Sequence, residues 1–112
     1  MKIAIPVADG KLDLHFGHCK SFALLDVDLD NKQIVSRNDV DAPPHEPGLL
    51  PAWLGDKNVE LVISGGMGQK AKQLFEARSI RVVVGAPSET PELLAQAYLD
   101  GGLASGANAC DH

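Results

Sequence analysis

The chain has few aromatic residues, few basic residues and no long apolar run. Only 4% of its 112 residues are aromatic, and 10 Lys and Arg residues stand against 15 Asp and Glu residues, which gives a net charge of −5. This composition lacks the stacking platforms and the basic footprint that are typical of nucleic-acid-binding proteins. No stretch approaches the roughly 18 apolar residues of a membrane span, and the N-terminus reaches Asp9 too early for a secretory signal. We therefore expect a cytoplasmic protein that binds neither nucleic acid nor a membrane.

Cysteine is scarce as well, and its two occurrences, Cys19 and Cys110, lie far apart in the chain. A structural disulfide is not expected in a reducing cytoplasm, where thiols near histidines are more often metal ligands. The 45% hydrophobic content can supply a core, and the length predicts one domain over residues 1–112. Residues 103–112 carry no periodicity and are expected to form an irregular tail.

The first half of the chain carries three short apolar segments, which predict strands at residues 3–7, 21–28 and 33–37. The polar tip at residues 28–32 predicts a hairpin between the second and third strands, and so an antiparallel meander. Residues 12–19 are irregular and are predicted to form a loop. Pro6 cannot donate a ladder hydrogen bond, so we expect it at a strand end or at an unpaired position.

The second half alternates helical patterns with apolar strands. A helix is predicted to begin between Gly48 and Pro51, and a second to run through Met67 and Phe75. A third is predicted to start at the Thr90 cap and to stop at residues 101–102, burying Leu93, Leu94, Ala97 and Tyr98. Strands are predicted at residues 59–63 and 80–84. The order β-β-β-α-β-α-β-α predicts an α/β fold with one mixed five-stranded sheet and helices on both faces.

A glycine-rich turn, Ser64-Gly65-Gly66-Met67-Gly68, connects a predicted strand to a predicted helix. Bare backbone N–H groups at such a turn suit an anion, but a tight connection alone accounts for the glycines equally well. The dinucleotide pattern G-x-G-x-x-A fits from Gly66, yet the next strand ends in Gly85-Ala86-Pro87, without the acid that would hold a ribose. We expect Gly66 to adopt a positive φ, which a β-branched residue would not tolerate.

All the histidines and cysteines fall in predicted loops or in the tail: His15, His18, Cys19, His45, Cys110 and His112. Thiolate and imidazole donors suit zinc, copper or iron–sulfur species. The alternative is a scatter of surface histidines, because the spacing matches no established metal motif. The alternating acids Asp26, Asp28 and Asp30 are predicted to be a solvated face. No nucleophile–base arrangement is evident, so the protein is expected not to be an enzyme.

Four stretches together resemble the dinitrogenase iron–molybdenum cofactor biosynthesis family, the small NifX-type cofactor-binding domains. They are Lys2-Ile3-Ala4-Ile5-Pro6, His15-Phe16-Gly17 with Phe22, Val62 to Gly68, and Val84-Gly85-Ala86. The resemblance implies a ribonuclease-H-like fold without nuclease activity. It also implies non-covalent binding or carriage of an iron–molybdenum or other metal–sulfur cluster. Residues 43–48 and 110–112 are similar to a stand-alone subgroup of the family.

The resemblance implies a cofactor-binding set of His15, Phe16, Gly17, Gly65, Gly66, Met67 and Gly68. The subgroup likeness implies metal ligands at His18, Cys19, His45, Cys110 and His112. The expected partners are cofactor-assembly or acceptor proteins, and the chain is expected to be a monomer or a weak homodimer. Replacing Cys19 or Cys110 by serine is expected to lower metal occupancy and to leave the apo thermal midpoint little changed. Two alternatives stay open: a single zinc or iron ion held by Cys and His, or an adaptor that acts by protein contact.

Overall fold

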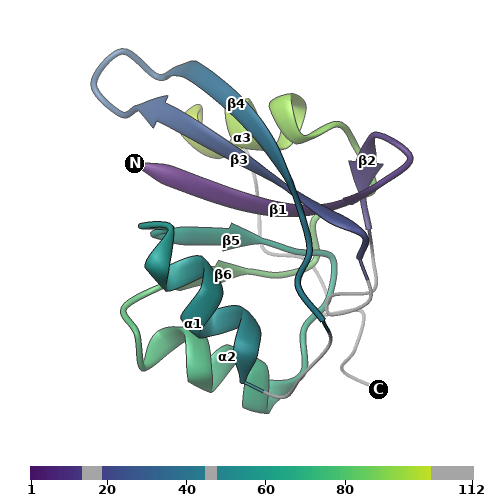
Figure 1. Cartoon of the computed structure of the whole chain (residues 1–112). Coiled ribbons are helices and arrows are strands. Elements are labelled where there is room, and N and C mark those ends of the chain that lie inside the picture. The colour runs from purple at the N-terminus through teal and green to yellow at the C-terminus, as the bar shows by residue number, and fades with distance from the viewer. Residues whose placement is uncertain (14–18, 45–47, 102–112) are drawn as a thin grey trace.

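The computed structural model describes residues 1–13, 19–44 and 48–101, which form one mixed sheet covered by three helices (Figure 1). The sheet has the strand order β4-β3-β1-β5-β6, with the short strand β2 beside β1. This arrangement is the ribonuclease-H-like α/β fold, and the predicted order of elements is confirmed. The strands are β1 (Lys2–Ala8), β2 (Lys11–Leu12), β3 (Ser21–Asp28), β4 (Gln33–Asp41), β5 (Leu61–Ile63) and β6 (Arg81–Val83).

The sheet has six strands rather than five, because part of the predicted loop at residues 12–19 pairs back on β1. Asp9 and Gly10 both adopt a positive φ, of 53° and 81°, which is the backbone of a two-residue hairpin turn. Lys11 therefore lies opposite Ala8, and Leu12 opposite Val7. The Asp-Gly pair indicates the turn in the sequence, but two residues are too few to show strand periodicity.

The antiparallel meander of β1, β3 and β4 is confirmed, and β4 extends to Asp41, beyond the predicted end at residue 37. Pro6 lies inside β1, opposite Phe22 of β3. Its carbonyl accepts a hydrogen bond from Asp13 N on the side away from β3, so its nitrogen faces that side too. On that side β1 pairs with β5 at Ile3 and Ala4 and with β2 at Val7 and Ala8, so Pro6 lies between the two pairings, where its missing N–H interrupts neither of them.

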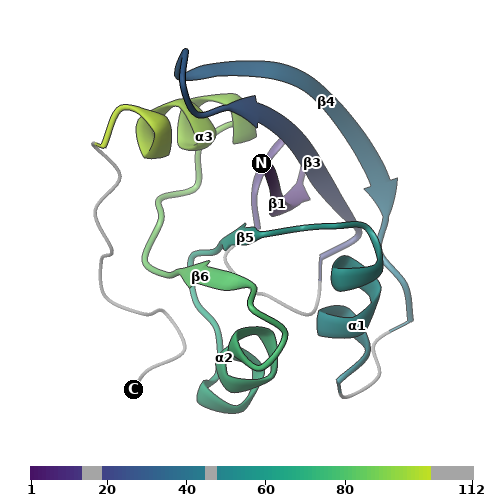
Figure 2. The same cartoon turned by 90° about the vertical axis from the view of Figure 1, so that its left-hand side faces the viewer.

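Helices lie on both faces of the sheet, as predicted (Figures 1 and 2). They are α1 (Leu49–Asp56), α2 (Gln69–Glu76) and α3 (Pro91–Leu99). One buried apolar cluster joins α3 to the inward side chains of β1, β3 and β5. A second joins α1 and α2 to the opposite face. All three residues of β5 are buried, which explains why this predicted segment is almost wholly apolar, whereas the edge strand β6 is only partly buried. Among the described residues, no helix combines the length and the apolarity that crossing a membrane requires.

The third helix begins where the sequence predicts, but its buried face differs from the predicted one. Thr90 caps it, since its hydroxyl accepts a hydrogen bond from Leu93 N at 3.4 Å. The predicted burial of Leu93 is wrong, because this side chain is 59% exposed. The helix instead turns Leu94, Ala95 and Leu99 inward, with Tyr98 partly buried beside them. Leu93 points about 100° away from Leu94 around the helix, which places it outside the core.

An ion-pair network holds the edge strand β4 against α3. Arg37 donates to Glu92 at 2.7 Å and to Asp39 at 2.8 Å. The hydrogen bond from Arg37 holds the pKa of Glu92 below the ordinary glutamate value. Exposed pairs of this kind contribute little to stability, about 0–1 kcal/mol. The network therefore orients β4 and α3 without dominating the stability of the fold.

Candidate functional site

The candidate site lies at the edge of the sheet where the parallel strands end. Strands β1, β5 and β6 run in one direction, and β4 shares it because both it and β1 are antiparallel to β3. The carboxyl ends of these four strands and the start of β3 therefore meet at one edge. In open α/β sheets, ligands bind outside the carboxyl ends of the strands.

The described residues that flank the segments 14–18 and 45–47 lie at this same edge. Asp13 N donates to Pro6 O at 2.9 Å, which places the residue before the first segment alongside β1, level with the end of β5. Cys19 follows the first segment, and Ala42 N donates to Lys20 O at 2.9 Å just after β4. Gly48, at the start of α1, follows the second segment. The described flanks of both predicted ligand loops are thus gathered around one edge.

Most of the predicted site residues lie outside the described residues: His15, Phe16, Gly17, His18, His45, Cys110 and His112. The tail after Gly101 leaves the described fold at the other edge, because Gln96 Nε2 of α3 donates to Lys32 O in the distant β3–β4 turn. Residues 102–112 could span at most about 36–40 Å when extended. Among the described residues, no group of three or more His, Cys, Asp or Glu side chains could hold a metal ion. The convergence of the predicted ligands stays a prediction.

The glycine turn is held by a buried serine. Ser64 is 0% exposed, and its hydroxyl donates to Gly66 O at 2.9 Å and accepts from Gly66 N at 3.2 Å. Its backbone N donates to Val83 O at 2.8 Å, and its carbonyl accepts from Ala86 N at 3.2 Å. Ser64 thus holds the glycine turn through its side chain, and its backbone connects the turn to the end of β6. Ser64 is absent from the predicted site, although it stands directly before the glycines.

The positive φ predicted for Gly66 is wrong, and it occurs instead in the neighbouring turn. Gly85, after β6, has a φ of 81°, and its N–H donates to Gly65 O at 3.1 Å. The left-handed backbone of Gly85 turns its N–H toward the glycine turn, and L side chains rarely adopt that conformation. Gly66 does not share this backbone, and its N–H donates to the Ser64 hydroxyl within the turn.

Only the last residue of the glycine turn is exposed. Gly65, Gly66 and Met67 are buried, whereas Gly68 is exposed and lies immediately before α2. Its φ of −64° and ψ of 152° are extended, and it provides no side-chain cap for the helix. The first N–H groups of α2 therefore have no intrahelical acceptor and no capping side chain. These N–H groups and the helix dipole make this end of the turn suitable for an anion.

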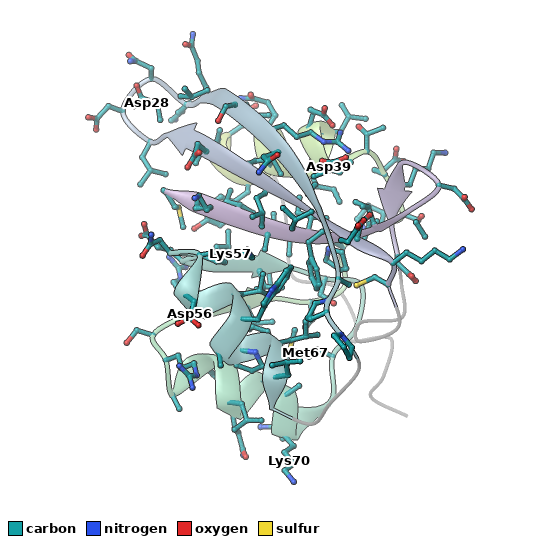
Figure 3. The ribbon with its side chains drawn as sticks, viewed as in Figure 1. Asp28, Asp39, Asp56, Lys57, Met67 and Lys70 are labelled. Atoms are coloured by element: carbon teal, nitrogen blue, oxygen red, sulfur yellow. The ribbon has the colours of Figure 1, made fainter. Side chains whose placement is uncertain are left out.

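Cys19 and Met67 are buried beneath this edge in one apolar cluster with Phe22 and Phe75. Cys19 is 2% exposed and Met67 1%, and Figure 3 shows Met67 turned toward the interior. Cys19 is the one predicted metal ligand among the described residues. Its burial shows that it packs in the core, and its role as a ligand stays a prediction.

Replacing Cys19 by serine is expected to destabilise the apo protein by about 1–3 kcal/mol, because a hydroxyl would enter an apolar cluster. This replaces the expectation of a nearly unchanged midpoint that the sequence suggests for Cys19→Ser. Thermal unfolding of the metal-free variant measures the effect, and Cys19→Ala, which adds no polar group, is the matched comparison. An unchanged midpoint in Cys19→Ser would show that Cys19 contributes nothing to packing.

Strand order and site together define a ribonuclease-H-like domain with a glycine turn at the carboxyl edge of its parallel strands. The sequence matches the dinitrogenase iron–molybdenum cofactor family over residues 1–101, and the chain belongs to that family.

Similar proteins cover nearly the whole chain. The uncharacterised protein MJ0580 of Methanocaldococcus jannaschii is 29% identical over 107 residues, which is 92% of this chain and 89% of that protein. The crystal structure of PH0822 superposes with a TM-score of 0.88 at 25% identity and covers 100% of both chains. The apo form of the orange protein from Desulfovibrio gigas superposes with a TM-score of 0.73 at 26% identity, over 96% of this chain and 93% of that one.

Proposed function

We propose that this protein binds a metal–sulfur cluster of the iron–molybdenum type without a covalent bond and carries it for cofactor assembly or delivery. One observation supports this most directly. The exposed end of the glycine turn presents uncapped helix N–H groups at the edge where the flanks of both donor-rich segments gather. The family of the chain is cofactor-related, so the geometry and the family point to the same class of ligand.

The electrostatics of the turn suit such a cargo. Metal–sulfur clusters of this kind are anionic, and backbone N–H groups stabilise an anion without a buried cation. A carrier must also release what it binds. Loops that supply a few ligands release a cluster more readily than a closed tetrahedral cage of side chains. We propose Gly65 to Gly68 with His15, Phe16 and Gly17 as the cofactor-binding residues. We further propose His18, Cys19, His45, Cys110 and His112 as residues that contribute metal ligands.

We propose binding rather than catalysis. The one buried polar side chain at the described part of the site is that of Ser64, and both its donor and its acceptor capacity are used by Gly66. A hydroxyl engaged in this way is not activated by a base, as a nucleophile would require. The residues described at this edge therefore support a role in holding a ligand.

Anaerobic reconstitution tests the proposal. The full chain is incubated with ferrous iron, sulfide and molybdate, desalted, and examined by metal analysis and visible absorption. The expected result is bound iron or molybdenum together with sulfide and with charge-transfer bands. A colourless protein that holds one zinc ion would support the single-ion alternative. A protein that stays metal-free under every condition would overturn the proposal.

A further inference from the structure

A hollow of about 490 Å³ lies between the start of α1 and the first two turns of α2. The described residues that line it are Gly48, Lys70, Ala71 and Leu74. It is open because small residues meet there: Gly48 has a φ of 78° and would place a Cβ within 4 Å of nothing. Leu74, on the other side of the hollow, is 38% exposed although it is a large apolar side chain.

A cation stands beside this apolar hollow. Lys70 and Leu74 are four residues apart on α2, so they lie on the same side of the helix. Lys70 extends away from the body of the molecule at the start of α2 (Figure 3). Within the described part of the chain, no carboxylate forms an ion pair with Lys70. Among the residues that the structure describes, the strip therefore combines a positive charge that pairs with no carboxylate and an exposed apolar side chain.

The hollow also adjoins the candidate site. Helix α2 begins one residue after Gly68, and Lys70 and Ala71 belong to its first turn. A molecule seated in the hollow would thus lie next to the exposed end of the glycine turn. A partner docked there would hold its own receiving or donating groups close to the cargo.

We propose that this strip, Gly48, Lys70, Ala71 and Leu74, is the docking surface for the protein that exchanges the cluster, and that the partner presents an acidic helix with a leucine-like anchor. The inference rests on the proposed function. An amphipathic helix laid in a groove is a recurring mode of recognition, in which apolar anchors fill hollows and charges at the rim set the orientation. Charge complementarity selects the acidic partner.

The test uses the apo full chain labelled with ¹⁵N and a synthetic amphipathic peptide of about 15 residues, a length that allows helix formation. One peptide carries leucines on one face and glutamates at the flanks, and a second replaces the glutamates by lysines. We expect the acidic peptide to shift the amide signals of the strip, and the basic peptide to bind at least about tenfold more weakly. Lys70→Glu is expected to weaken the acidic peptide about tenfold and to restore binding of the basic one. Leu74→Gln is expected to weaken both.

Arg78→Glu is the matched control, because Arg78 is another cation that lies just past the end of α2; it is expected to leave the binding of the acidic peptide unchanged. Equal binding of both peptides, or shifts confined to another surface, would overturn the docking proposal. Reconstitution with iron, sulfide and molybdate is measured separately for each variant. Loss of peptide binding with normal metal occupancy concerns docking alone, and loss of occupancy in the unaltered chain concerns the proposed function alone.

Discussion

Replacing Gly68 by threonine is expected to lower cofactor occupancy at least tenfold and to leave the fold intact. The backbone at Gly68 is extended, with φ −64° and ψ 152°, and a Cβ there would meet nothing within 4 Å. Threonine is also a favourable helix cap, so the free energy of unfolding should change by less than about 1 kcal/mol. The new side chain would nevertheless cover the approach to the turn. Its hydroxyl would also accept a hydrogen bond from one of the N–H groups proposed to face the cluster.

The measurements are metal per chain after anaerobic reconstitution and the thermal midpoint of the apo variant. Gly55→Ala is the matched control, because a Cβ at Gly55 in α1 would make ordinary contacts of 3.9 Å with Arg78 and Ile80. Alanine in a helix is more stable than glycine by about 0.5–1 kcal/mol, and occupancy should not change. If Gly68→Thr reconstitutes as fully as the unaltered chain, the cargo does not approach this end of the turn.

Replacing Phe75 by alanine is expected to lower the free energy of unfolding by about 3–5 kcal/mol. Phe75 is 0% exposed and packs in the cluster that joins α1 and α2 to the sheet. The substitution removes buried apolar area and leaves a cavity that the surrounding strands cannot close completely. For a domain of this size the thermal midpoint should fall by about 12 °C or more.

Leu74→Ala is the matched comparison, because Leu74 is the preceding residue of the same helix and is 38% exposed. Its loss should cost less than half as much, because less of its surface is buried. Chemical denaturation of both variants measures the difference. Similar losses would contradict the assignment of Phe75, and not Leu74, to the buried face of α2.

Local patterns predict the elements well where several residues repeat the same signal. The Thr90-Pro91-Glu92 start of α3 is confirmed because a cap, a proline and an acid act within one turn. The sequence does not predict strand β2, because its two residues carry no periodicity and pair with β1 through the turn at Asp9 and Gly10. Leu93 is wrongly assigned to the core because an apolar residue shows only that it can be buried, and not which side of a helix faces the sheet.

The candidate site divides in a similar way. Its glycine turn can be found from the sequence, because a cluster of glycines between a strand and a helix is typical of a turn that a ligand or another backbone approaches closely. The positive φ at Gly85 and the link from Ser64 to the end of β6 cannot, because both involve hydrogen bonds between two turns that about 20 residues separate in the chain. The burial of Cys19 cannot be predicted from the sequence either, because a thiol suits a metal site and an apolar core equally well.

The alternation of apolar strands with helices identifies the class of fold, and the order and spacing of four short stretches identify the family: Lys2–Pro6, His15–Gly17 with Phe22, Val62–Gly68 and Val84–Ala86. These properties are local, since each arises from neighbouring residues along the chain. Strand order, by contrast, brings the ends of β1, β4, β5 and β6 to one edge and leaves Gly68 as the exposed residue of its turn. Packing between distant segments sets such exposure, because a side chain or an N–H group is reachable only where no other part of the chain covers it.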